Sequence, residues 1–79
     1  MKILKYIINK RNMPIVFSPT ILHNEILQEG QSAGYITLKL NKNNNLFTVK
    51  CFGESSTLKI GIADGDEILI EEFLNKQFL

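Results

Sequence analysis

The 79-residue sequence contains one cysteine, one histidine and no tryptophan. Because Cys51 has no second cysteine to pair with, an internal disulfide is excluded. His23 and Cys51 alone cannot supply the four ligands of a structural zinc ion, so we predict no metal and no cofactor. A chain of this length buries only about 60–65% of its unfolded surface. Self-association is the remaining source of added stability, and we predict a homo-oligomer.

The sequence also lacks an excess of charge of either sign and a long apolar run. Nine basic and eight acidic residues give a net charge of +1, unlike the basic footprint of a nucleic-acid-binding domain. We therefore predict no DNA or RNA polymer as partner. No apolar run approaches the about 20 residues that span a bilayer, and the opening MKILKYIINK lacks the small-residue cleavage site of a signal peptide. We expect a soluble, cytoplasmic protein with no membrane partner.

The patterns that indicate strands and helices predict one α+β domain over residues 1–79. Residues 33–41 and 46–52 alternate apolar and polar side chains around an asparagine-rich turn, which predicts a hairpin. Strands are also expected over 2–9, 13–18 and 57–63. Helices are expected over 19–29 and from Asp64 onward. The order ββαβββα predicts a small antiparallel sheet of about five strands, with both helices on one face.

Two capping patterns predict where the helices begin. Ser18 followed by Pro19 is a typical N-terminal pair, and the spacing then puts Leu22 and Ile26 on one buried stripe. Asp64 followed three residues later by Glu67 resembles a capping box.

We predict no catalytic residue and no enzymatic activity. Cys51 shares its strand face with Phe47 and Val49, so its thiol is expected to face the interior. His23 lies beside the Leu22 and Ile26 stripe and is expected to be a partly exposed helix residue. The sequence has no Gly-x-Ser-x-Gly motif for a nucleophilic serine.

Two short polar segments predict a ligand site. QSAGY (31–35) and GESST (53–57) combine small residues with hydroxyls and backbone amides, which can hold phosphate oxygens. A carboxylate at Glu54 suits ribose hydroxyls or a base edge, and Tyr35 and Phe52 suit base stacking. The alternative is that both segments are ordinary turns and both aromatic rings pack in the core or an interface. The predicted ligand-binding residues are Ser32, Gly34, Tyr35, Gly53, Glu54, Ser55, Ser56 and His23.

The order PIVFS, SAGY, CFGESSTL and a final FL resembles a family of short uncharacterised bacterial and bacteriophage proteins. The resemblance implies a small stand-alone protein of phage origin, but no function. By analogy with small phage proteins we expect a non-catalytic binder of a small nucleotide-like ligand, acting as a sponge that sequesters a nucleotide immune signal. The alternative is a protein-interaction module or inhibitor that binds a host protein at an exposed edge near Pro14.

Overall fold

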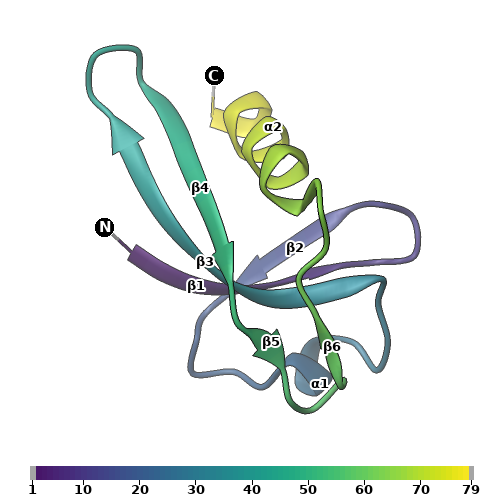
Figure 1. Ribbon diagram of the computed structural model, residues 1–79. Helices are drawn as coiled ribbons and strands as arrows, with labels where there is room; N and C mark the ends of the chain where they lie inside the picture. The colour runs from purple at the N-terminus through teal and green to yellow at the C-terminus, as the bar shows by residue number, and fades with distance from the viewer. Residues whose placement is uncertain (1, 79) are drawn as a thin grey trace.

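The computed structural model describes residues 2–78 of the chain, with side chains for residues 2–76. It confirms the α+β class: within residues 2–78, a four-stranded antiparallel sheet in the order β2-β1-β3-β4 packs with two helices and a separate pair of short strands (Figure 1). The elements are β1 (Lys2–Ile8), β2 (Pro14–Phe17), α1 (His23–Ile26), β3 (Ser32–Asn41), β4 (Leu46–Phe52), β5 (Glu54–Ser55), β6 (Ile60–Gly61) and α2 (Asp66–Phe78).

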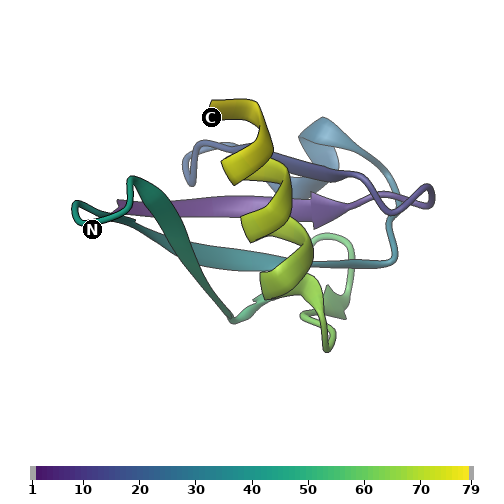
Figure 2. The same cartoon turned by 90° about the horizontal axis from the view of Figure 1, so that it is seen from above.

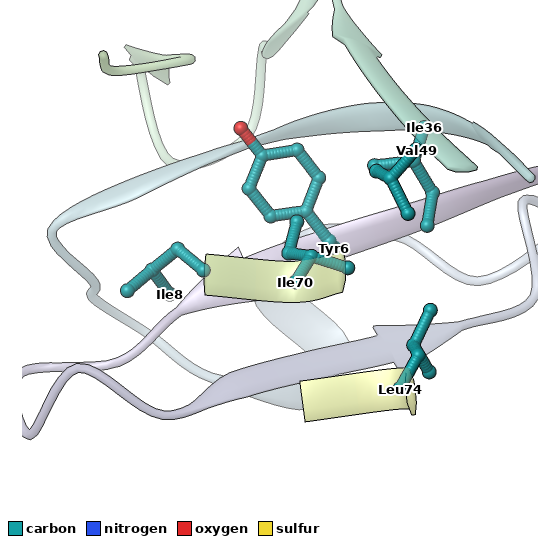
Figure 3. Packing of buried hydrophobic residues seen from close by; sticks show 6 residues of the cluster. All are labelled: Tyr6, Ile8, Ile36, Val49, Ile70 and Leu74. Carbon is teal, nitrogen blue, oxygen red and sulfur yellow. The ribbon is translucent and has the colours of Figure 1, made fainter. Parts of the chain in front are cut away.

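Helix α2 covers one face of the sheet and crosses above β1, β2 and β3 (Figure 2). The core lies between α2 and this face, because strand residues such as Tyr6, Ile36 and Val49 point toward the helix residues Ile70 and Leu74 (Figure 3). Each fully buried branched aliphatic side chain contributes about 1.5–3 kcal/mol to the free energy of folding. The predicted hairpin of β3 and β4 is present, with Thr37 opposite Lys50.

Side chains of α2 also hydrogen-bond the outer edge of β4. The amides of Val49 and Cys51 donate to Glu71 Oε2 at 3.2 Å and Glu67 Oε2 at 2.7 Å, and the Phe47 amide donates to Asn75 Oδ1 at 2.8 Å. Four helical residues rise about 6.0 Å, and two strand residues about 6.8 Å. This similarity lets every fourth side chain of α2 meet the outward-facing amide of every second residue of β4, so side chains of the helix satisfy this edge of the sheet.

The first helix differs from the prediction. The segment after Ser18 forms a turn in which the Ile21 amide donates to Ser18 O at 3.1 Å, and α1 is limited to His23–Ile26. Leu22, predicted to be buried, is 49% exposed. The prediction failed because burial of His23 on the sheet outweighs the local apolar stripe. His23 packs on Phe17 and Tyr35, whose neighbours Val16 and Ile36 face the α2 core. Helix α1 therefore lies on the face opposite α2, not on the same face as expected.

The predicted strand over 57–63 is also mostly wrong. Residues 56–59 form a turn, and only Ile60 and Gly61 pair, with β5 and not with the main sheet. The last helix begins at Asp66, where the Asp66 carboxylate accepts a hydrogen bond from the Ala63 amide. The predicted capping box of Asp64 and Glu67 is therefore wrong, because the Glu67 carboxylate accepts a hydrogen bond from the Cys51 amide of β4 instead.

The helices of residues 2–78 are short. The longer one, α2, has 13 residues. Neither combines the length and apolar character that crossing a bilayer requires.

Candidate functional site

The two polar segments predicted to form a site are neighbours in the fold. Tyr35, in the first segment, pairs across the sheet with Phe52, which precedes the second. A methyl group placed on Gly34 would lie 2.9 Å from the carbonyl oxygen of Phe52 and 3.5 Å from that of Gly53. The glycine at position 34 therefore permits the close approach of the chain on which this junction depends.

Two of the predicted serines point into the protein. The Ser32 hydroxyl, 2% exposed, donates to Asp66 Oδ1 at 3.0 Å. The Ser55 hydroxyl, 1% exposed, accepts from the Leu58 amide at 3.1 Å and so fixes the turn after β5. Because both hydroxyls are used within the fold, and Gly34 is buried beneath Ile62, we assign these three residues a structural role.

His23 is buried at 3% exposure, so the expectation of a partly exposed histidine is wrong. Its Nε2 donates to the carbonyl oxygen of Gly34 at 3.0 Å. The imidazole meets the rings of Phe17 and Tyr35 edge to face, at centroid distances of 5.5 and 6.0 Å. His23 therefore supports Tyr35 from below and fixes the start of β3, and we assign it no direct ligand contact.

A buried polar group around Asp66 was not found from the sequence. The Tyr6 hydroxyl donates to Asp66 Oδ2 at 2.6 Å, and Ser32 and the Ala63 amide donate to the same carboxylate. Burial, with the hydrogen bond to Asp66, raises the pKa of Tyr6 well above its ordinary range. No local pattern signals this group, because Tyr6 and Asp66 are 60 residues apart. It ties the start of α2 to β1 and β3.

Cys51 is half-buried and packs against the core, as its strand position predicted. Burial raises the pKa of the thiol to about 11. The hydrogen bond with Tyr6 lowers this pKa, while the carboxylates of Glu67, Asp66 and Glu71 raise it. The thiol is therefore protonated at neutral pH, which does not suit a nucleophile.

Part of the sheet face opposite α2 carries solvent-accessible side chains. We define the open face as three cross-strand pairs of β3 and β4, namely Tyr35–Phe52, Thr37–Lys50 and Lys39–Thr48. The hairpin that carries them extends away from α1 and from the β5–β6 pair (Figure 1). The Tyr35 and Phe52 rings are stacked, with centroids 5.5 Å apart and planes inclined by 22°. Phe52 is 40% exposed, and Lys39, Thr48 and Lys50 are exposed.

No protein-family model, curated protein or solved structure matches the chain.

Charge is divided between the two sides of the molecule. Acidic residues gather at the start of α2 and along it, at Asp64, Asp66, Glu67, Glu71 and Glu72, whereas the open face carries Lys39 and Lys50. Among the side chains of residues 2–76, neither of these lysines pairs with a carboxylate; the ion pair that is present joins Lys10 and Glu29. The open face thus offers an aromatic surface and positive charge together.

Lys5 stabilises the aromatic end of this face from within. Its side chain is buried, its Nζ lies 5.6 Å from the centroid of the Tyr35 ring, and it donates to the carbonyl oxygen of Ile21 at 2.8 Å. The Tyr35 ring is therefore held between Lys5, His23 and Phe52. This support fixes the orientation of the ring on which Phe52 stacks.

Proposed function

We propose that the chain is a non-catalytic protein that binds a small nucleotide-like ligand on the open face. The observation that carries this proposal is the exposed Phe52 ring, fixed by its stack on Tyr35 and followed along the same face by Lys50. A base that stacks on an aromatic side chain gains about 1–3 kcal/mol of binding free energy. The ammonium group of Lys50, beside the ring, attracts the phosphate of the same ligand.

The residues of the GESST segment that reach solvent complete the candidate site. Gly53 takes a φ of +73°, exposes its backbone and lies against the Tyr35 ring. Glu54 and Ser56 are exposed beside it. A carboxylate at Glu54 can accept hydrogen bonds from ribose hydroxyls or from an exocyclic amine, and the Ser56 hydroxyl can donate or accept. The predicted ligand-binding set is thereby reduced to Tyr35, Gly53, Glu54 and Ser56, with Phe52 and Lys50 added.

The biological role that we propose is that of a cytoplasmic, phage-encoded sponge for a nucleotide signal, assembled as a homo-oligomer. The resemblance of the SAGY and CFGESSTL segments to short phage proteins supports the biological role. Two exposed apolar side chains support self-association: Phe52, which belongs to the open face, and Ile3, which lies beside it. A second copy placed against Ile3 would enclose the ligand. Native mass spectrometry of the purified chain reports the subunit number and any retained ligand together.

The test of ligand binding is an equilibrium titration of the chain with AMP and with ribose 5-phosphate at low ionic strength. We expect AMP to bind roughly 5- to 150-fold more tightly, because only AMP has a base to stack on Phe52. The Phe52→Ala variant should lose this difference. Met13→Ala, which removes another exposed apolar side chain, in the connection between β1 and β2, is the matched control and should retain it. Equal affinity of the native chain for both probes would refute the proposal.

A protein-interaction role remains the second candidate, and the position of β2 favours it. The opposite edge of the sheet, β4, is occupied by α2 side chains, whereas β2 is the other edge strand. The Asn9 amide donates to Met13 O, and the alternation of an antiparallel pair then points the Val16 amide outward. A protein partner that is bound by the native chain and by Phe52→Ala, but not by Val16→Pro, would support this role over ligand binding.

A further inference from the structure

We infer that the ligand of the open face carries two phosphate groups separated by a nucleoside, as in a short oligonucleotide of two or three units. This inference rests on the proposed function and concerns the class of the ligand. Its basis is that positive charge continues along the open face well beyond the distance that one nucleotide covers from Phe52.

The spacing of the strand residues sets this distance. Lys50 lies two residues before Phe52 on β4, and Lys39 pairs with Thr48, a further two residues away. Two strand residues span about 7 Å, so Lys50 lies one such step from the aromatic pair and Lys39 lies two, or about 14 Å. A nucleotide whose base stacks on Phe52 therefore places its own phosphate within reach of Lys50. Lys39 is left to meet a second, more distant phosphate.

The far end of the open face is also hollowed. A shallow pocket of about 430 Å³ is lined by Lys39, Leu40, Asn41, Lys42 and Thr48. The lining residues carry two ammonium groups, a side-chain amide and a hydroxyl, and each of these groups can donate hydrogen bonds to phosphate oxygens. The pocket is adjacent to the third pair of the open face, since Lys39 and Thr48 belong to both.

The arrangement of charge gives the ligand a direction. Glu54 is exposed next to Gly53, at the aromatic end, where a carboxylate would repel a phosphate. Lys39 and Lys42 are at the opposite end. A ligand with its base over Phe52 and its phosphates toward the β3–β4 turn keeps its negative charge away from Glu54 and close to Lys39 and Lys42. The reverse direction would place a phosphate beside Glu54.

The experiment compares AMP, ATP and the 5′-phosphorylated adenosine dinucleotide in titrations of the native chain. ATP carries more charge than the dinucleotide, but all of it at one end of a single nucleoside. We expect the dinucleotide to bind more tightly than either AMP or ATP. Replacing both pocket lysines (Lys39→Ala with Lys42→Ala) should weaken dinucleotide binding roughly tenfold and leave AMP binding unchanged.

The matched control removes the same two charges elsewhere, by Lys10→Ala with Lys76→Ala, and should leave the preference for the dinucleotide intact. Thermal unfolding verifies that the variants fold, as expected for exposed lysines. If ATP binds as tightly as the dinucleotide, or if the Lys39 and Lys42 changes weaken AMP equally, the inference is overturned while the proposed function stands. If no nucleotide binds, both are overturned.

Discussion

At the scale of single residues, most of the small and hydroxyl-bearing positions that suggested a site serve the fold instead. Ser32 and Ser55 are engaged in buried hydrogen bonds, and Gly34 lies where three parts of the chain meet. Residue type and local spacing predicted which segments come together, but not which side chains turn inward. That choice depends on partners far along the chain, such as Asp66 for Ser32, 34 residues away.

Gly34 provides a test of this structural role. A Cβ at this position would lie 2.8 Å from Ile62 Cγ2 and 2.9 Å from the Phe52 carbonyl oxygen, both too close without rearrangement. We expect Gly34→Ala to destabilise the protein by about 1–3 kcal/mol in urea unfolding. Gly61→Ala is the matched control, because its nearest neighbour would be Glu54 Cβ at an ordinary 3.7 Å. Equal stability of the two variants would show that the close packing at Gly34 carries no energetic weight.

At the scale of elements, the sequence predicted the β1, β2, β3 and β4 strands and the C-terminal helix, and it failed for α1 and for the segment after β5. The successes have strong alternation or β-branched runs, as in the β3–β4 hairpin. The failures are segments whose conformation is set by other elements. His23 packs between Phe17 and Tyr35. Lys59 adopts a φ of +59° in a turn that is stabilised by the hydrogen bond from its amide to Ser55 O.

The contact between α2 and the edge of β4 leads to a prediction at this scale. Glu67→Ala removes the acceptor of the partly buried Cys51 amide, and we expect a loss of about 1–3 kcal/mol of unfolding free energy. Glu67→Gln retains an oxygen in the same place and should lose less than half as much. Glu72→Ala removes an exposed carboxylate of the same helix and should change stability by less than about 0.5 kcal/mol. Similar losses for Glu67→Ala and Glu72→Ala would contradict an edge-capping role.

At the scale of the whole molecule, stability should decline on the alkaline side. Cys51 ionises near pH 9.0 when unfolded and near pH 11 when folded, and the pKa of Tyr6 is also raised by burial. The unfolded chain therefore binds fewer protons than the folded chain above about pH 9, and stability falls as the pH rises through this window. Urea unfolding at neutral pH and between pH 9 and 11 measures the decline.

The Cys51→Ala variant separates the two contributions to this alkaline decline. It removes the thiol, so the part of the decline between pH 9 and 11 that belongs to Cys51 should disappear, while the part due to Tyr6 remains. An unchanged pH profile in Cys51→Ala would mean that the thiol keeps its ordinary pKa in the folded protein.

The first turn of α2 joins the strands in a way that bears on the order of folding. Asp66 accepts hydrogen bonds from β1 and β3, and the next residue, Glu67, accepts one from β4. A nascent chain in which α2 has not yet formed therefore lacks three hydrogen-bond acceptors. The Val49 and Cys51 amides of the hairpin and the Tyr6 hydroxyl are then without their final partners. Completion of the domain must await α2 (Asp66–Phe78), and until then the β4 edge can pair with a strand of another chain.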